Sequence, residues 1–242
     1  PIREDRSRTS LNLPGRQEEL LKAVCATGKP VVLVLLDGRA SSINYAAAHV
    51  PAILHAWFPG EFCGQAVAEA LFGDYNPGGR LAVTFPKSVG QIPFAFPFKP
   101  GSDESSSTSV YGVLYPFGHG LSYTTFSYGD LKISPLRQGV QGDINISCKI
   151  KNTGKIKGDE VVQLYLRDEV SSVTTYTKVL RGFERISLEA GEEQMVHFRL
   201  RPQDLGLWDK NMNFRVEPGK FKVMIGSSST DIRLHGRFEI AP

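Results

Sequence analysis

The sequence predicts a two-part fold, in which an α/β sandwich domain with a largely parallel sheet is followed by an all-β sandwich. Three observations lead to this prediction. Apolar runs of strand length alternate with helical periodicity up to residue 86, a polar and turn-rich stretch follows Pro97, and strict alternation of apolar and polar residues takes over beyond Phe126. At 242 residues, with 41% hydrophobic and 22% charged residues, the chain is long enough for two such domains.

The first part alternates between helix and strand. The predicted elements are a helix over 17–26, a strand over 30–36, a strand over 52–58, a helix over 61–72 and a strand over 81–85. Gly28 lies just past the first helix, where glycine commonly ends one. The run from Pro30 to Leu36 is continuously apolar and rich in valine, which is typical of a strand covered on both faces. The alternation favours a parallel sheet with helices packed on it.

The second part follows a linker or connecting loop, which we expect over 99–125, so that the α/β domain covers 1–98 and the sandwich 126–242. In the sandwich the apolar residues occupy every second position of successive short segments: Ile144, Ile146, Cys148 and Ile150; Val162, Leu164 and Leu166; Val196, Phe198 and Leu200; Phe221, Val223 and Ile225. Glycine-containing turn signals separate these segments. Roughly seven such strands predict a sandwich of the fibronectin type III or immunoglobulin kind.

Composition excludes several classes of function. The 28 Lys and Arg against 25 Asp and Glu leave no strong basic patch, so nucleic acid is not an expected partner. No apolar run reaches membrane-spanning length and no leader opens the chain, so we expect no membrane partner. Cys25, Cys63 and Cys148 are odd in number and far apart, which is typical of buried free thiols rather than of disulfides or metal ligands.

Motifs for other chemistries are missing from the sequence. There is no phosphate-binding glycine loop, no dinucleotide fingerprint and no serine elbow, and the five histidines lack the spacing of metal ligands. We therefore expect neither a cofactor nor a metal. His197 alternates with apolar neighbours and is expected to face solvent, whereas His119, in a Gly-His-Gly turn, is either a loop residue or a ligand contact. Carboxylates remain as the groups able to carry chemistry.

Two stretches of the chain resemble the C-terminal half of glycoside hydrolase family 3. They are residues 71–86, LFGDYNPGGRLAVTFP, and residues 114–126, LYPFGHGLSYTTF. They follow LNLPG at 11–15 and KPVVLVL at 29–35, in the order that the family shows. The resemblance covers essentially the whole chain and implies an α/β domain plus a fibronectin III-like domain. It also implies a catalytic TIM barrel upstream, as a domain or a separate chain, so that these residues form the second part of an enzyme.

Family 3 enzymes use an Asp nucleophile on the barrel and a Glu acid/base in a stretch of the form Glu-Gly-x-Asp-Arg, shortly before a Leu-x-Leu-Pro segment. The matching stretch here is 4–8, Glu-Asp-Arg-Ser-Arg. The resemblance therefore implies that Glu4 is the acid/base, with Asp5 as the competing carboxylate. The family's Gly and Asp are replaced by Asp5 and Ser7. Interpreted without the family, the same stretch is an ordinary solvated run of charge.

Arg3, Arg6 and Trp57 are the candidate substrate-binding residues. Trp57 lies at the end of the apolar strand predicted over 52–58, where its ring is suited to stacking on a pyranose or to a place in the core. No Asp in the chain resembles the family's nucleophile, and Asp37 and Asp74 lie in tight turns that explain them without catalysis.

The implied activity is exo-acting, retaining hydrolysis, with oligosaccharides or β-glycosides as substrates. A β-glucosidase that releases terminal non-reducing β-D-glucose is expected first. A β-xylosidase is the alternative, because the charged Glu-Asp-Arg-x-Arg form also resembles xylosidase members. A non-catalytic carbohydrate-binding or adhesion module and a family member that has lost its chemistry stay open as rivals. We expect a secreted or periplasmic protein and consider a homodimer as its assembly.

Overall fold

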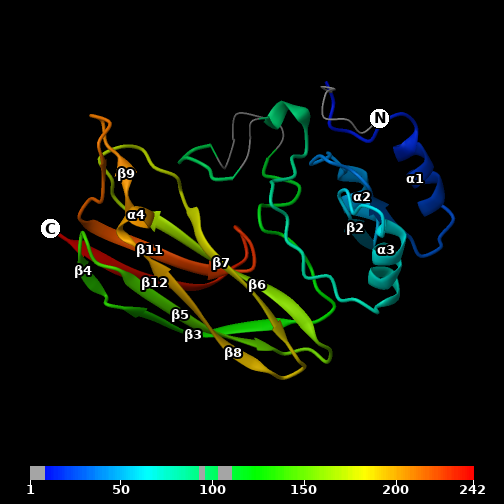
Figure 1. Cartoon of the computed structure of the whole chain (residues 1–242). Helices are drawn as coiled ribbons and strands as arrows, with labels where there is room; N and C mark the ends of the chain where they lie inside the picture. The colour runs from blue at the N-terminus through cyan, green and yellow to red at the C-terminus, as the bar shows by residue number, and fades with distance from the viewer. Residues whose placement is uncertain (1–8, 93–95, 103–110) are drawn as a thin grey trace. The chain divides into compact units, whose positions relative to one another are not determined.

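The computed structural model describes residues 9–92, 96–102 and 111–242. Two compact units interleave along the sequence, and their elements are labelled in Figure 1. Unit 1 takes residues 1–75, 83–96 and 104–116, whereas unit 2 takes residues 76–82, 97–103 and 117–242. Each unit therefore contains segments that are distant in the sequence.

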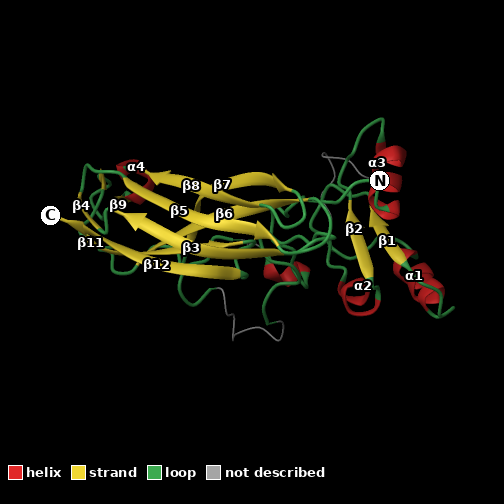
Figure 2. Ribbon diagram, turned by 90° about the horizontal axis from the view of Figure 1, so that it is seen from below, coloured by secondary structure: helices red, strands yellow, loops and turns green. Residues whose placement is uncertain are grey.

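Unit 1 is built on two parallel strands, which lie side by side in Figure 2. Its elements are α1 (Gln17–Cys25), β1 (Val32–Leu35), α2 (Asn44–His49), β2 (Ala52–His55), α3 (Cys63–Phe72) and the 3-10 helix η1 (Val89–Gln91). Val32 pairs with Ala52 and Leu35 with His55, so both strands end at the same edge. This pairing confirms the predicted parallel sheet. The buried core is small and consists of Leu21, Leu35, Ile43, Ala46 and Val50.

Most predicted elements of unit 1 are confirmed, with shorter bounds. The helices predicted over 17–26 and 61–72 are α1 and α3, and the first two predicted strands are β1 and β2. α3 ends where Gly73 takes a left-handed φ of +86° and donates its N–H to the carbonyl of Glu69 at 3.1 Å, as a glycine cap does. α2 is not among the predicted elements, because its 6 residues are too few for a helical period to be recognised.

The prediction of a third strand in the α/β part, over 81–85, is wrong. Over 81–85 the backbone is not a strand, and Phe85 makes only an isolated antiparallel bridge with Tyr115. At the other end of the segment, the N–H of Leu81 bonds to the carbonyl of His119 at 2.8 Å. A short apolar run indicates an extended segment but not the backbone with which it pairs.

Large apolar side chains of unit 1 are left uncovered by the described residues. The prediction that the first strand is covered on both faces is wrong for this part of the chain, because Val32 and Leu36 at its two ends are 48% and 49% exposed. Further exposed residues of unit 1 are Leu20, Phe58, Phe62 and Phe72. Isolated exposed apolar residues are ordinary, but here several occur on one small unit.

Unit 2 is a β-sandwich (Figure 1). Its strands are β3 (Phe126–Ser134), β4 (Arg137–Gly139), β5 (Ile144–Asn152), β6 (Gly158–Asp168), β7 (Val179–Leu188), β8 (Glu193–Leu200), β11 (Gly219–Gly226) and β12 (Ile232–Ala241). One sheet has the order β4-β12-β11-β6-β7 and the other β3-β5-β8. Helix α4 (Pro202–Leu205) and a hairpin of β9 (Leu207–Trp208) and β10 (Phe214–Arg215) complete the unit. The predicted all-β sandwich is confirmed.

The alternation seen in the sequence builds the core of this sandwich. On β5, Ile144, Ile146, Cys148 and Ile150 are each at most 1% exposed. Burying a side chain of this size contributes about 1.5–3 kcal/mol. Burial also raises the pKa of the Cys148 thiol to about 11, so this cysteine is an inert core residue, as predicted. Cys25 and Cys63 are free but only half-buried, so the prediction of burial is wrong for these two. His197 on β8 is exposed, also as predicted.

Two segments of the chain are held on the sandwich by hydrogen bonds, and we call residues 76–82 and 117–124 together the clasp. Asn76 accepts hydrogen bonds from the hydroxyl of Ser122 at 3.0 Å and the N–H of Tyr123 at 2.8 Å. Its amide donates to the carbonyl of Lys157 at 3.0 Å, just before β6. The clasp therefore joins parts of the two stretches that carry the family resemblance, and it belongs to the sandwich rather than to the parallel sheet.

Candidate functional site

The site proposed from the resemblance is only partly described. Four of its candidate residues lie outside the described residues: Arg3, Glu4, Asp5 and Arg6. The structure does describe the segment that directly follows them. The carbonyl of Leu11 accepts a hydrogen bond from the N–H of Ser42 at 2.9 Å. The hydroxyl of Ser42 in turn donates to the carbonyl of Pro86 at 3.0 Å. The segment after the candidate stretch is thus anchored in the loop that follows β1.

That loop lies at the edge of the parallel sheet where both strands end. Asp37 follows β1 and Trp57 follows β2, and these strands pair in register from Val32 with Ala52 to Leu35 with His55. In open parallel sheets, ligands bind outside the carboxyl ends of the strands. This edge is therefore the candidate functional site of unit 1.

Aromatic rings form one wall of this site. The rings of His55 and Trp57 meet edge to face with centroids 4.1 Å apart, and Phe85 lies 5.3 Å from His55 and 6.2 Å from Trp57. Tyr115 follows at 6.1 Å from Phe85. Phe85 is only 1% exposed, whereas Trp57 is half-buried. Phe85 therefore anchors the cluster, and part of the Trp57 ring remains available to a ligand.

Trp57 also has an unusual backbone. Its φ is +54°, in the left-handed region that a bulky residue rarely adopts. Such a conformation costs about 1–3 kcal/mol and persists only where the surrounding structure holds it. The backbone conformation at Trp57 is therefore held by the surrounding structure.

His55 is a member of this site that sequence reasoning missed. Burial lowers the pKa of its imidazole, an effect opposed by the carboxylate of Asp37 and by the backbone of Arg39. Neither ring nitrogen makes a well-directed hydrogen bond with a described residue. Buried polar atoms normally have partners; the backbone of Arg39 reaches this imidazole, and a ligand or a water can complete its hydrogen bonds. The only signal in the sequence was a single imidazole inside the apolar run 52–58.

The carboxylate of Asp37 is held in the loop after β1. It accepts a hydrogen bond from the hydroxyl of Ser41, which is almost completely buried. Gly38 lies directly against the ring of Phe58, and a Cβ at this position would meet that ring at 2.4 Å. A side chain at this position would displace the exposed ring of Phe58, and the packing seen here brings the loop after β1 against the chain that follows Trp57.

His119 occupies a structural position in the clasp. Its carbonyl accepts the hydrogen bond from Leu81, and the N–H of the preceding Gly118 donates to the carbonyl of Leu81 at 2.7 Å. Burial, together with the nearby charge of Arg80, lowers the pKa of the His119 imidazole. These contacts favour the role of a loop residue over that of a ligand contact.

Other kinds of site are not found in the described residues. Across 9–92, 96–102 and 111–242, no group of three or more His, Cys, Asp or Glu is placed to hold a metal ion. In the same part of the chain, no helix has the length and apolar character needed to cross a membrane. The chemistry available at the sheet edge therefore consists of hydroxyl, imidazole and carboxylate groups beside an aromatic wall. Such a set suits the recognition of a polyhydroxylated ring.

The fold and this edge describe a two-domain piece of a carbohydrate-active protein, and comparison with known proteins defines the family. The model described as the glycosyl hydrolase family 3 C-terminal domain matches residues 2–123, and the model of the fibronectin type III-like domain matches residues 160–229. The chain belongs to glycoside hydrolase family 3.

Relatives and solved structures agree with this assignment. The chain is 45% identical to a beta-xylosidase of Formosa agariphila over 93% of this chain and 32% of the relative. It is 41% identical to the periplasmic beta-glucosidase of Salmonella typhimurium over 98% of this chain and 32% of the relative. Among solved structures, a β-glucosidase of Erythrobacter marinus matches with a TM-score of 0.92 and 41% identity, over 97% of this chain and 31% of that one. The chain thus spans about a third of the length of the relatives that it matches.

Proposed function

We propose that this chain is the C-terminal part of an exo-acting, retaining β-glucosidase that releases terminal non-reducing β-D-glucose. Membership of the family and the names of several relatives support a glycosidase. The observation that carries the proposal is the anchoring of Leu11 to Ser42. It fixes the segment that directly follows the candidate stretch 4–8 in the loop between Asp37 and α2, at the edge where Trp57 lies.

In the proposed mechanism, Glu4 protonates the departing glycosidic oxygen and then removes a proton from the attacking water. An Asp on an upstream barrel attacks the anomeric carbon, because two carboxylates are needed for double displacement. Arg3 and Arg6 contact the substrate and Trp57 stacks on its ring. Asp5 is the competing residue for the acid/base role.

The proposal requires a barrel, as a domain of the same polypeptide or as a separate chain. Two observations support it: the chain spans about a third of its relatives, and unit 1 exposes Leu20, Val32, Phe58, Phe62 and Phe72. We infer that part of this apolar surface is covered in the complete enzyme. One relative carries the name periplasmic beta-glucosidase, which supports a secreted or periplasmic location.

The acid/base assignment is tested in the complete enzyme with Glu4→Ala. Hydrolysis of an unactivated β-glucoside should fall by about a hundred- to ten-thousand-fold, because the leaving group is no longer protonated. A dinitrophenyl β-glucoside needs little protonation, so the glycosyl-enzyme should still form and then break down slowly. Azide, which attacks without a base, should restore turnover and yield a β-glycosyl azide.

The matched control is Glu19→Ala, which removes an exposed carboxylate of α1 and should leave the rates unchanged. If Asp5→Ala rather than Glu4→Ala shows azide rescue, the match of stretch 4–8 to the family's acid/base motif is displaced by one residue, and Asp5 is the acid/base. If neither variant changes the rates, stretch 4–8 is not the source of the acid/base.

A β-xylosidase is the second candidate, because the relative with 45% identity carries that name. The two activities differ by the hydroxymethyl group at carbon 5 of the sugar. Measuring kcat/KM of the complete enzyme for aryl β-glucoside and aryl β-xyloside decides between them. A higher value for the xyloside would replace the glucosidase assignment but keep the mechanism.

A further inference from the structure

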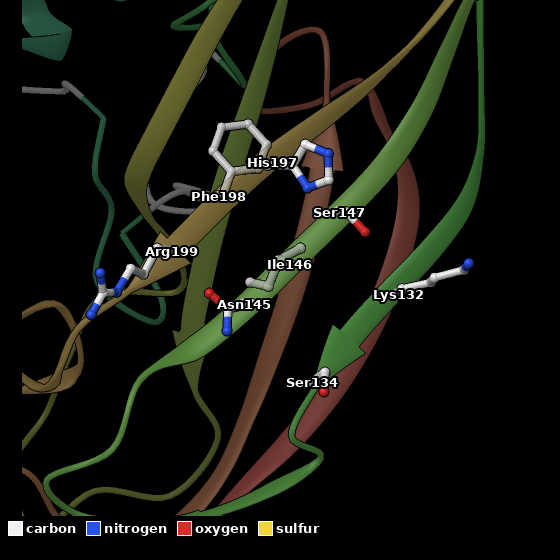
Figure 3. Close-up of a pocket in the computed structure, with 8 residues that line it drawn as sticks. All are labelled: Lys132, Ser134, Asn145, Ile146, Ser147, His197, Phe198 and Arg199. Carbon is white, nitrogen blue, oxygen red and sulfur yellow. The ribbon is translucent and has the colours of Figure 1, made fainter.

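A pocket lies on the outer face of the three-stranded sheet of unit 2, formed by β3, β5 and β8. Its volume is about 420 Å³, within the range of about 300–1,000 Å³ typical of small-molecule sites. Figure 3 shows that the side chains around it come from all three strands of that sheet. The lining residues are Lys132 and Ser134 of β3, Asn145, Ile146 and Ser147 of β5, and His197, Phe198 and Arg199 of β8.

Strand register explains why the surface is hollowed here. Lys132 pairs with Ser147 and Ser147 with His197, which places the three in one row across the sheet. The next row of outward side chains is Ser134, Asn145 and Arg199. In the first row the small Ser147 of the central strand lies between the longer Lys132 and His197, and in the second row Asn145 lies between the small Ser134 and the longer Arg199. The result is a trough that runs along β5.

Most polar side chains of this trough make no hydrogen bond or ion pair with the described part of the protein. Among the described residues, none of the following side chains makes a hydrogen bond or an ion pair: Lys132, Ser134, Asn145, Ser147 and His197. The charged side chains elsewhere on the same face are paired. Lys149 lies 2.7 Å from Asp130, and both Lys149 and Lys151 approach Glu193. At the other end of the trough, Arg199 is paired with Asp143.

This contrast separates the trough from an ordinary solvated sheet face, on which unpaired polar side chains are scattered. Here they line a hollow in two rows across the sheet, with ion pairs at both ends. Lys132 makes no ion pair within 4.0 Å with a described carboxylate, and Asp130, whose pKa is lowered by Lys149 and to a smaller extent by the charge of Lys132, is already paired with Lys149. The small polar residues of the floor offer hydroxyl and amide groups, which pair well with sugar hydroxyls.

We propose that this trough is a binding site for a saccharide unit that carries one anionic group. Lys132 pairs with the anion, and the side chains of Ser147, Asn145 and His197 bond the ring hydroxyls. The sugar nature of the occupant rests on the proposed function, and the requirement for an anion rests on Lys132. A carboxylate of a uronic acid and a sulfate ester share this chemistry.

The test is isothermal titration of this chain with three ring-matched probes: D-glucuronate, glucose 6-sulfate and glucose. At least one anionic probe should bind about tenfold or more tightly than glucose, because a charge-assisted hydrogen bond contributes more than a neutral one. Binding of glucuronate alone identifies a uronic acid, binding of the sulfate alone identifies a sulfate ester, and binding of both identifies a general anion site.

Two variants locate the binding. Lys132→Met should lower the affinity for the anionic probe about tenfold, so that this probe no longer binds more tightly than glucose. Ser147→Tyr should abolish binding by filling the floor. The matched control is Lys151→Met, which removes the same charge from the same sheet face outside the trough and should leave the affinity unchanged. Thermal melting of each variant reports whether the sandwich is intact.

The proposal is overturned if glucose binds as tightly as the anionic probes, if no anionic probe binds, or if Lys151→Met weakens binding as much as Lys132→Met does. Hydrolysis of aryl glycosides by the complete enzyme is measured in parallel. Binding is recorded without turnover. A trough that does not bind the probes and an enzyme that does not hydrolyse glycosides are therefore separate results.

Discussion

The guanidinium of Arg80 lies 2.6 Å from the carboxylate of Glu160, and the two side chains are only 7% and 3% exposed. Arg80 belongs to the first segment of the clasp and Glu160 to β6 of the sandwich. The same carboxylate also accepts the N–H of Val161 at 2.7 Å. A buried ion pair adds little to stability when it is compared with apolar residues, but loss of one partner leaves an uncompensated buried charge.

Replacing one partner of this pair should therefore destabilise unit 2 strongly. We expect Arg80→Met to lower the free energy of unfolding by about 3–5 kcal/mol, measured by urea unfolding. The double variant Arg80→Met/Glu160→Leu should recover most of the loss. As a control, Arg185→Met removes the surface pair with Asp159 and should cost about 1 kcal/mol or less. Equal losses for the two single variants would contradict the assigned role of the buried pair.

Close approach within the clasp should make Gly120 intolerant of a side chain. A Cβ at this position would lie 2.2 Å from the carbonyl oxygen of Gly79, which as backbone has little freedom to move. We expect Gly120→Ala to cost about 1–3 kcal/mol of unfolding free energy. Gly129→Ala is the control, since a methyl group there would meet no atom within 4 Å and the φ of Gly129 is not positive. A Gly120→Ala protein as stable as the control would show that the clasp does not pack as described.

Asp168 should make the sandwich less stable as pH rises. Burial, with the nearby charge of Glu217, raises the pKa of this carboxyl from 3.8 to about 6. The folded state then binds the proton more tightly than the unfolded state, so the stabilisation is complete below pH 3.8 and is lost as pH rises to about 6. We expect Asp168→Asn to flatten this part of the curve and to add about 1 kcal/mol at pH 7, after allowance for solvent screening of a half-buried group.

The measurement is the free energy of unfolding of both proteins from pH 3.5 to 7.5 in steps of about half a unit. The amide of the variant keeps an oxygen for the N–H of Val170, so the local hydrogen bond is preserved. Parallel curves for the two proteins across this window would show that Asp168 does not titrate with a raised pKa.

Substitution of Trp57 should affect substrate binding in the complete enzyme more than the chemical step. Removing the ring from the wall formed with His55 and Phe85 deletes a stacking surface worth about 0.5–1.5 kcal/mol. We expect Trp57→Ala to raise KM several-fold, with a smaller change in kcat, and Trp57→Phe to retain most of the affinity. A large loss of stability with an unchanged KM in the folded fraction would instead assign Trp57 to the core.

The candidate site could be predicted only in part. The sequence places Trp57 at the end of an apolar strand, and the structure ends β2 two residues earlier, at His55. His55 was not recognised, since one imidazole has no spacing to interpret and its meaning depends on Phe85, which is distant in the sequence. The role of Glu4 comes from resemblance alone and stays a prediction.

By itself, the sequence determined the two classes of structure and their order along the chain. Side chains alternate across a β-sheet, so the placement of Ile144, Ile146, Cys148 and Ile150 at every second position leaves one arrangement in which they share a core. Only the tertiary structure decided the partners of the extended run 81–85, whose ends pair with His119 and with Tyr115 instead of adding a strand to the parallel sheet. The physical reason is that backbone hydrogen bonds between distant segments depend on which segments meet in space, and such pairing leaves no period in the sequence.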